Sequence, residues 1–251
     1  MIVLKSPDEV ARMRVSGRIA ARVRDKLAQS ISPGTTTGDL DAFAAELIKG
    51  FGAESAFLGY RGFPGHVCLS VNEEVVHGIP GKRRVGLGDI GSVDVGVRYG
   101  GYIGDTATTV MVGVCDADVI RLVASAEKAL YAGIEKARPG NRLSDISNAI
   151  ETLARGMGFQ VVRKFVGHGV GRKMHEPPEV PNFGPPGQGP KLREGMTLAL
   201  EPMVNMGTGD VDVMGDGWTV VTADRKPSAH FEHTVALCED GARILTLADG
   251  E

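Results

Sequence analysis

The chain has 251 residues, with 28 basic against 31 acidic side chains, a net charge of −3 and 42% apolar residues. That length can bury a full hydrophobic core, and the near-neutral charge argues against a strongly basic nucleic-acid binder, so we expect no DNA partner. The three cysteines, Cys68, Cys115 and Cys238, are too few and too widely spaced for a disulfide framework or a zinc knuckle. Glycine is abundant, at 35 residues, which indicates tight turns and close backbone approach.

We expect neither a secretory leader nor a membrane partner. The first residues reach a charge at Lys5, too early for a leader, and no run approaches about 18 consecutive apolar residues. The expected setting is the reducing cytoplasm, with the protein in soluble form.

Two helices are predicted at the start of the chain. Ser6-Pro7-Asp8-Glu9 is a capping box with proline at the first helical position, which predicts a helix over about residues 7–29. Thr36 or Thr37 opens a second helix, with apolar residues at helical spacing until the glycines at 50 and 52.

Strands and a second helical pair follow. Short apolar runs at 67–71, 75–76, 90–97 and 102–112, separated by Gly, Asn and Pro, predict strands. Helical periodicity returns over about 117–136 and 144–155. From Val161 onward the pattern is again strand and loop, including a Gly/Pro-rich stretch at 181–190.

The order of two helices and then strands therefore occurs twice, and the sequence itself repeats weakly at an offset of 106 or 107 residues. The matches include Pro33-Gly34 with Pro139-Gly140, Leu47 with Leu153, and Gly88…Asp94 with Gly195…Glu201. We expect an α/β (α+β) fold forming one catalytic domain, 1–251. Its two equivalent ααββ halves, about 1–115 and 116–251, would pack around a pseudo-twofold axis and a central antiparallel sheet.

Four carboxylates interrupt apolar strand patterns: Asp94, Asp105, Glu201 and Glu232. One such acid could simply end a strand or accept hydrogen bonds. A buried ionised carboxylate otherwise costs several kcal/mol unless it is paired or bound to a cation. A pseudo-twofold axis would bring two acids from each half to one central point, where divalent cations would be needed to neutralise them.

Three histidines stand in segments suited to a site. His168 lies between glycines in Gly167-His168-Gly169, His175 follows before two prolines, and His77 precedes Gly78. A set of four acids and one imidazole suits Mn²⁺, Fe²⁺, Co²⁺ or Zn²⁺ in a two-metal centre. Two such cations about 3.5–4 Å apart hold a water or hydroxide and polarise a carbonyl, which predicts hydrolysis of a carbonyl compound. No GxSxG elbow, P-loop or dinucleotide fingerprint offers another chemistry.

With these residues laid out, the chain resembles the type I methionine aminopeptidases over nearly its whole length. The resemblance rests on strings that occur in order: Ser70-Val71-Asn72-Glu73, His77-Gly78-Ile79-Pro80, Gly104-Asp105-Thr106, Gly167-His168-Gly169, His175-Glu176-Pro177-Pro178, Glu201-Pro202, Gly217-Trp218-Thr219 and Phe231-Glu232-His233-Thr234. It implies the pita-bread fold, which agrees with the internal repeat.

The resemblance also implies roles for the site residues. Asp94 would chelate one metal, His168 and Glu201 the other, and Asp105 and Glu232 would bridge the pair. His175 would donate to the scissile carbonyl oxygen, His77 would contact the substrate near the amide, and Glu201 would shuttle a proton from the water that attacks the first peptide bond. The methionine pocket would be lined by Tyr60, Phe63, Cys68 and Trp218, with Phe57 and Met174 adjacent.

The implied reaction is release of the initiator methionine from nascent polypeptides whose second residue is small, by a monomeric enzyme. Three positions depart from the family pattern and bear on the pocket and its surroundings: Val76, Met174 and His230. The first predicted helix carries Arg14, Arg18 and Arg22 at i, i+4 spacing, with Arg24 nearby. This row is either a solvated helix face or a weak, salt-dependent contact with the ribosome.

Two other interpretations remain open on the sequence. An Xaa-Pro aminopeptidase or prolidase shares the fold and metals, although such enzymes usually carry an extra N-terminal domain. A non-catalytic adaptor of the same fold would typically have lost metal ligands, and all five candidates are present here.

Overall fold

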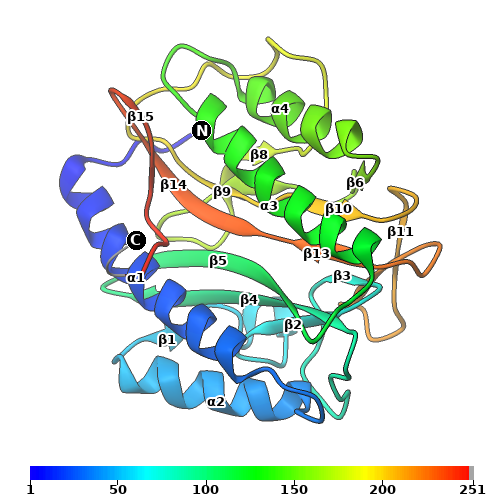
Figure 1. Cartoon of the computed structure of the whole chain (residues 1–251). Helices are drawn as coiled ribbons and strands as arrows, with labels where there is room; N and C mark the ends of the chain where they lie inside the picture. Colours follow the sequence, from blue (N-terminus) through cyan, green and yellow to red (C-terminus); the bar gives the residue numbers. More distant parts are fainter. Residues whose placement is uncertain (249–251) are drawn as a thin grey trace.

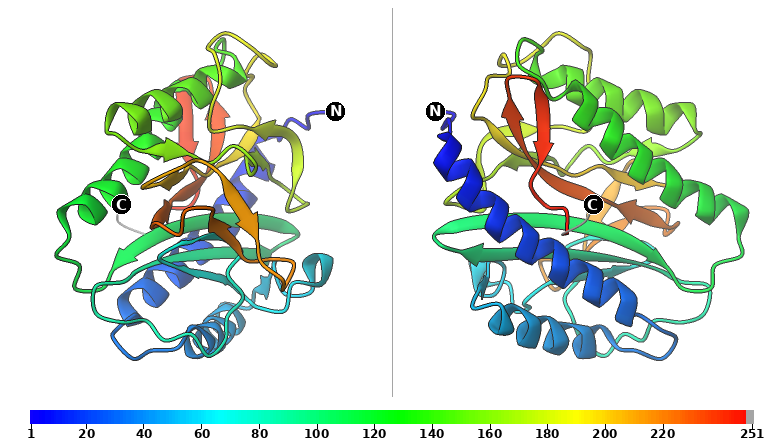
Figure 2. Two further views of the ribbon diagram at one scale, coloured as in Figure 1. Left: turned by 90° about the vertical axis from the view of Figure 1, so that its right-hand side faces the viewer. Right: turned by 60° about the vertical axis from the view of Figure 1, so that its left-hand side comes forward.

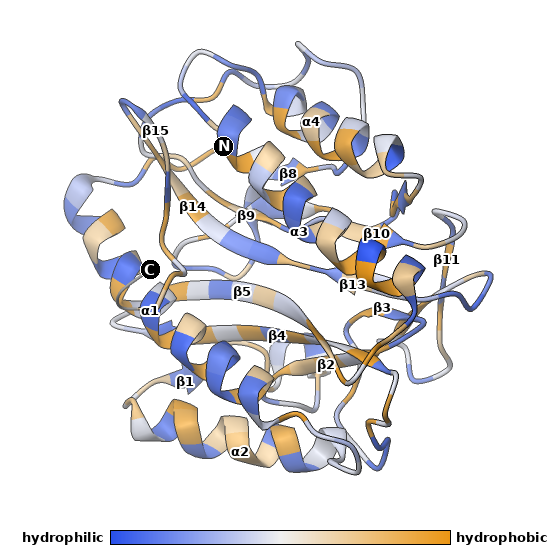
Figure 3. Ribbon diagram, in the orientation of Figure 1, coloured by the Kyte–Doolittle hydropathy of each residue, from blue (hydrophilic) through white to orange (hydrophobic). Residues whose placement is uncertain are grey.

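Two pairs of helices accompany a long, curved antiparallel sheet in the computed structural model of this chain, which describes residues 1–248 (Figures 1 and 2). The helices are α1 (Pro7–Ser30), α2 (Thr37–Gly50), α3 (Ala117–Lys136) and α4 (Leu143–Gly156), with a 3-10 turn, η1 (Tyr60–Gly62). All four predicted helices are therefore confirmed, each within one residue of its predicted start. Apolar and polar residues alternate along them (Figure 3).

Capping accounts for the helix starts. Ser6 accepts a hydrogen bond from the backbone N–H of Glu9, and the Glu9 side chain accepts one from the N–H of Ser6, so the predicted capping box is present. Thr36 and Asp39 form the same box at the start of α2.

The strands of the first part are β1 (Glu54–Ser55), β2 (Cys68–Val71), β3 (Glu74–Val76), β4 (Ile90–Tyr99) and β5 (Tyr102–Met111). Those of the second part are β6 (Gln160–Val161), β7 (Gly167–Gly169), β8 (Glu176–Val180), β9 (Thr197–Leu200), β10 (Met203–Asn205), β11 (Val211–Val213), β12 (Val220–Thr222), β13 (Ser228–His230), β14 (Glu232–Cys238) and β15 (Gly241–Ile244). The predicted strand regions and the loop at 181–190 are confirmed. One detail was wrong: Glu201 lies just past the end of β9 rather than inside a strand.

The main sheet has the order β1-β4-β5-β14-β9-β7-β8, with β2 also paired to β4 and β15 to β14. Two smaller sheets have the orders β13-β10-β6 and β11-β12-β3. The central pair, β5 and β14, joins the first part of the chain to the last, because Ala107 pairs with Glu232 and Thr106 with His233. The mixed α/β class is therefore confirmed.

Helix α1 approaches β5 at two glycines. A Cβ on Gly104 would lie 2.5 Å from the backbone nitrogen of Gly17, so only hydrogen atoms allow helix and strand this close. Further along α1, Arg24 is buried: it pairs with Asp25 and donates to Thr106 Oγ1 at 2.8 Å. Arg24 therefore does not belong to an exposed basic row with Arg14, Arg18 and Arg22, although it lies near them in the sequence.

The face of the sheet opposite these helices holds the site described next. Across residues 1–248, no helix combines the length and apolar content that crossing a bilayer requires.

Candidate metal centre and its pocket

Strand register places the candidate metal ligands on one face of the main sheet. Asp94 on β4 and Glu232 on β14 both pair with Ala107 of β5, and residues paired across antiparallel strands share a face. Asp105 lies two residues from Ala107 and therefore points to the same side. On the other flank, Ala199 of β9 pairs with both His168 and Thr234, so these three residues share a face. Glu201 lies two residues after Ala199, and Glu232 lies two residues before Thr234, which places both acids near the same face.

The neighbouring residues face the opposite way. Thr106 contacts Arg24 of α1, and the ring of His233 lies 6.0 Å from that of Tyr131 on α3. The helices thus cover one face of the β5–β14 pair and leave the other for the site. Because successive side chains along a strand point to opposite faces of the sheet, the site and the helical layer lie on opposite sides.

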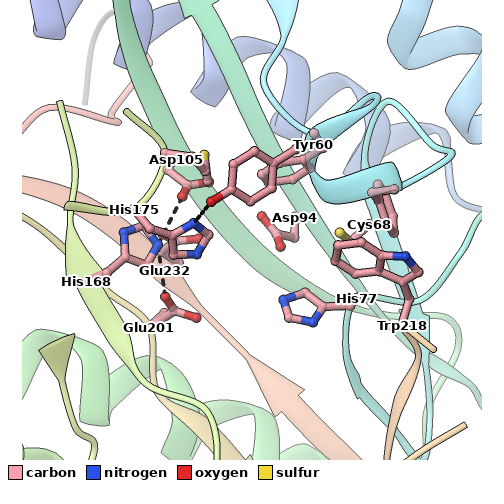
Figure 4. Close-up of a pocket in the computed structure, with 13 residues that line it drawn as sticks. Tyr60, Cys68, His77, Asp94, Asp105, His168, His175, Glu201, Trp218 and Glu232 are labelled. Atoms are coloured by element: carbon pink, nitrogen blue, oxygen red, sulfur yellow. Dashed lines mark hydrogen bonds and ion pairs between the residues drawn. The ribbon is translucent and has the colours of Figure 1, made fainter. Parts of the chain in front are cut away.

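One pocket gathers every residue that the sequence assigned to the site (Figure 4). Its lining residues are Phe57, Tyr60, Phe63, Cys68, His77, Asp94, Asp105, His168, Met174, His175, Glu201, Trp218 and Glu232. Asp105, His168, Glu201 and Glu232 lie on one side with His175, and Asp94 lies between this group and the other side. Cys68, His77 and Trp218 form that other side (Figure 4).

His168 is held in the tautomer that suits a metal ligand. Its Nδ1 lies 2.9 Å from the carbonyl oxygen of Gly169, an acceptor, so Nδ1 carries the hydrogen and Nε2 keeps its lone pair. That Nε2 faces two carboxylates, 3.5 Å from Glu201 Oε1 and 3.7 Å from Asp105 Oδ2. Burial lowers the pKa of His168 to about 3, so the imidazole is neutral and available for coordination.

The carboxylates cannot all be ionised without a compensating charge. Burial raises the pKa of Asp94 to about 7 and raises the pKa values of Asp105, Glu201 and Glu232 well above their usual range, and the negative charges of the neighbouring acids raise these three further. Asp105 and Glu232 share a hydrogen bond between their carboxyl groups, which requires a proton on one of them. Burial and mutual repulsion therefore favour the protonated forms of these acids, whereas a bound cation would favour the ionised forms.

The polar atoms of the cluster fit a divalent cation. Among residues 1–248, no hydrogen-bond partner reaches the buried oxygens Asp94 Oδ1, Asp105 Oδ1 and Glu232 Oε1, a costly arrangement for carboxylates. One ligand atom each from Asp105, His168 and Glu232 lies within 4.8 Å of the others. Oxygen donors with one imidazole suit first-row divalent metals, and the site carries no thiolate set of the structural-zinc type.

Two further histidines line the pocket. His77 adopts a left-handed backbone conformation, φ 59°, which a non-glycine residue rarely adopts and which marks a position the surrounding structure constrains. Its ring lies edge-on to Trp218 and Phe165, and burial lowers the pKa of His77 to about 4. His175 lies 4.2 Å from His168 between ring centroids, and burial together with the cation of Arg61 lowers its pKa.

The apolar side of the pocket is built from aromatic and sulfur-containing residues. Phe63 and Trp218 meet edge to face with centroids 5.1 Å apart, and Phe57, Cys68 and Met174 belong to the same buried cluster. Trp218 is presented by a turn in which the Asp216 carboxylate accepts hydrogen bonds from the N–H groups of Trp218 and Thr219. This wall can bury an unbranched, polarisable side chain.

The three departures from the family pattern have different surroundings. Val76 packs in a separate buried cluster and does not line the pocket, whereas Met174 does. His230 is buried, and its Nε2 lies 3.8 Å from Glu201 Oε2 with no hydrogen-bond partner in the part of the chain that the structure describes. Ala107 and Phe165 were not predicted as part of the site, because a lone alanine or phenylalanine in a strand-rich region carries no signal of its own.

Comparisons with known proteins identify the family to which the chain belongs. Residues 11–239 match metallopeptidase family M24. Methionine aminopeptidase 1 of Bacillus subtilis is 50% identical over 246 residues, covering 98% of this chain and 99% of that protein. Methionine aminopeptidase of Clostridium perfringens is 51% identical over 247 residues, with the same coverage.

Solved structures give the same result. The crystal structure of methionine aminopeptidase from Thermotoga maritima superposes with a TM-score of 0.96 at 46% identity, covering 98% of this chain and 99% of that one. Prolidase from Pyrococcus furiosus, at 22% identity and a TM-score of 0.81 over 98% of this chain and 66% of that one, shares the fold alone. The expected pita-bread fold is thus confirmed, and the chain belongs to metallopeptidase family M24, among its methionine aminopeptidases.

Proposed function

We propose that this chain is a metal-dependent aminopeptidase that removes the N-terminal methionine from nascent proteins whose second residue is small. The observation that carries the proposal is the single pocket in which a carboxylate–imidazole cluster adjoins an apolar, aromatic wall. Cleavage of the first peptide bond and recognition of the methionine side chain can then occur side by side.

The ligand roles are those that the resemblance to the methionine aminopeptidases implies, and the gathering of all five residues in one pocket supports them. Asp94 would chelate one cation, His168 and Glu201 would hold a second, and Asp105 and Glu232 would be shared by the two, with Co²⁺, Mn²⁺, Fe²⁺ or Zn²⁺ as candidates. Such a pair supplies Lewis-acid activation of the peptide carbonyl and of water. The chain's own contribution is to hold Asp94, Asp105, His168 and Glu232 on one face through strand register, with Glu201 just past the end of β9.

The remaining polar groups act on the substrate. Neutral His175 donates a hydrogen bond to the scissile carbonyl oxygen as negative charge develops there. His77 would contact the amide from the opposite side of the pocket, and the Glu201 carboxylate would accept a proton from the attacking water and pass it to the leaving amine. The methionine side chain occupies the wall formed by Tyr60, Phe63, Cys68 and Trp218.

We propose that residues 1–251 form one catalytic domain of two equivalent halves, about 1–115 and 116–251. Helices α2 (37–50) and α4 (143–156) begin and end 106 residues apart. Two backbone hydrogen bonds of the first half recur in the second half at nearly the same offset. The bond from Gly34 N–H to Val85 O corresponds to the bond from Gly140 N–H to Leu192 O. The bond from Gly38 N–H to Gly81 O corresponds to the bond from Ser144 N–H to Gln188 O. Equivalent halves explain why each contributes acids to a shared centre.

The cellular context completes the proposal. A monomer in the cytoplasm would meet nascent N-termini as they leave the ribosome, and Arg14 and Arg22, exposed on α1, could add a weak, salt-dependent contact there. Charge reversal on this helix that left ribosome co-sedimentation unchanged at low salt would remove that contact from the proposal.

The test is peptide cleavage after metal removal. Protein treated with a chelator is supplied with one metal at a time and assayed on Met-Ala-Ser and on an Xaa-Pro peptide, with metal binding counted by calorimetry. We expect restored cleavage of Met-Ala-Ser and about two bound cations per chain. A preference for Xaa-Pro would indicate a prolidase-like enzyme, and no cleavage with any metal would favour the non-catalytic adaptor.

A further inference from the structure

A phenol and an imidazole from distant parts of the chain meet at the mouth of the pocket. Tyr60 Oη lies 2.8 Å from His175 Nδ1, and the two rings stack with centroids 5.4 Å apart and an interplanar angle of 22° (Figure 4). The hydrogen bond and the stacking together fix both the plane of the His175 ring and the edge it turns toward the pocket.

The backbone that presents Tyr60 is tightly specified. Gly59 and Gly62 have left-handed φ values of 77° and 88°, and Arg61 between them has φ 50°, unusual for a side chain with a Cβ. Hydrogen bonds from Gly59 N–H to Phe63 O and from Phe63 N–H to Tyr60 O close this turn. Strain of this kind is retained where the position of a side chain matters.

The direction of the Tyr60–His175 hydrogen bond determines which nitrogen of His175 carries the hydrogen. The phenol O–H can donate to a bare Nδ1, or the phenol oxygen can accept from Nδ1–H. The guanidinium of Arg61 lies 5.5 Å from the centroid of the Tyr60 ring. A cation this close makes the phenol a better donor and a poorer acceptor, which favours donation from Tyr60 to Nδ1.

The neighbouring histidine has the opposite arrangement. His168 directs its Nδ1 at a carbonyl oxygen, which leaves Nε2 bare, whereas His175 directs its Nδ1 at a hydroxyl group. The two rings lie in contact, 4.2 Å between centroids, yet their Nδ1 partners select different tautomers. One imidazole is thereby prepared to accept a cation and the other to donate a hydrogen bond.

We propose that Tyr60 is a positioning residue that holds His175 in the Nε2–H tautomer, so that His175 can donate to the substrate carbonyl oxygen. The role is distinct from lining the methionine pocket, and it rests on the proposed function for its catalytic consequence. The tautomer itself is a property of the protein alone.

The first test reads the tautomer directly. Protein with ¹⁵N-labelled histidine, free of metal so that no paramagnetic ion interferes, is examined by long-range ¹H–¹⁵N correlation at pH 8, and the His175 signals are assigned from their absence in His175→Gln. We expect a protonated Nε2 in the wild type. In Tyr60→Phe we expect a mixture of tautomers, with an unchanged circular dichroism spectrum. Tyr99→Phe, at an exposed tyrosine of β4 outside the pocket, is the matched control and should leave the His175 signals unchanged.

The second test separates positioning from pocket lining. Tyr60→Phe keeps the aromatic ring, so KM for Met-Ala-Ser should stay within about twofold, while kcat should fall about tenfold, the worth of one hydrogen bond. A wild-type His175 protonated at Nδ1, or a Tyr60→Phe variant with an unchanged tautomer, would overturn the proposal. An inactive wild type with the expected tautomer would instead count against the proposed function while leaving the hydrogen-bond assignment intact.

Discussion

Asp94 and Glu232 pair with the same residue, Ala107, from the two sides of β5. The two acids are 138 positions apart in the chain and become near neighbours because the small methyl group of Ala107 is all that the sheet places between them. Asp105, on the same face of β5, completes the floor of the site. The carboxylate cluster thus depends on the register of three adjacent strands.

Ala107→Leu should abolish activity while the protein stays folded, because a leucine side chain would occupy the space between the acids. We expect a loss of cation affinity and of activity of at least about a hundredfold. Isothermal titration with Co²⁺ or Zn²⁺ and cleavage of Met-Ala-Ser measure the two effects. Thr108→Leu is the matched control, because Thr108 faces a cavity on the opposite side of the sheet and its substitution should leave cation affinity near that of the wild type.

Asp105→Ala should be more damaging than any change to the apolar wall. The variant removes a buried carboxylate that contacts both Glu232 and the Nε2 side of His168, so one bridging ligand is lost. We expect the second equivalent of cation to bind at least about a hundredfold more weakly, with a similar loss of rate. Unchanged kcat and an unchanged count of bound cations would contradict the bridging role.

The melting temperature of protein freed of metal by a chelator should depend on pH in a way that reveals the raised pKa of Asp94. The folded-state pKa of Asp94 is raised from 3.8 to about 7, so its contribution to stability is full below about pH 4 and is lost as the pH rises through 7. Asp94→Asn cannot ionise, so the melting temperature of the variant minus that of the wild type should increase from pH 5 to pH 8.

Adding Zn²⁺ at pH 8 should reverse that difference, because the cation binds ionised Asp94 and stabilises the folded state. Comparing variant with wild type at each pH cancels the opposite contributions of the buried histidines. A difference that stays flat or decreases with pH in chelated protein would show that Asp94 ionises normally.

Trp218→Ala should weaken recognition of the methionine side chain. Trp218 packs edge-on against Phe63 and beside His77, and its removal opens the apolar wall to water. We expect kcat/KM for Met-Ala-Ser to fall about tenfold to a hundredfold, mainly through KM, while the cation affinity remains as in the wild type. A large loss of cation affinity would mean that the turn at Trp218 supports the ligands as well as the pocket.

Gly104→Ala should destabilise the fold by about 2–3 kcal/mol, because its Cβ would meet backbone atoms of α1 that cannot move aside easily. Denaturant unfolding of protein freed of metal by a chelator measures the effect without a contribution from bound cations. Gly50→Ala is the control: its Cβ would meet nothing within 4 Å, and it ends α2 at negative φ, so stability should be unchanged or slightly higher. Equal stabilities would mean that α1 can shift away from β5.

Much of the fold and the site could be predicted from local features of the sequence. The helices are encoded by capping boxes and periodicity, which act over a few residues, so their ends were predicted closely. The acids and His168 could be recognised because ionisable groups within apolar or glycine-rich strands are costly without a partner. The resemblance to the methionine aminopeptidases then supplied an order for these residues that spacing alone does not contain.

Other properties exist only in the folded chain. Three of them join residues from distant segments: the row of Asp94, Ala107 and Glu232, the contact of buried Arg24 with Thr106, and the pairing of Tyr60 with His175. Strand register and side-chain packing determine them, and these depend on the whole sheet rather than on any local pattern. The sequence by itself determined which groups could do chemistry; the tertiary structure decided which of them touch, and hence which tautomers and protonation states they adopt, because these follow from the partners and the solvent that each group finds after folding.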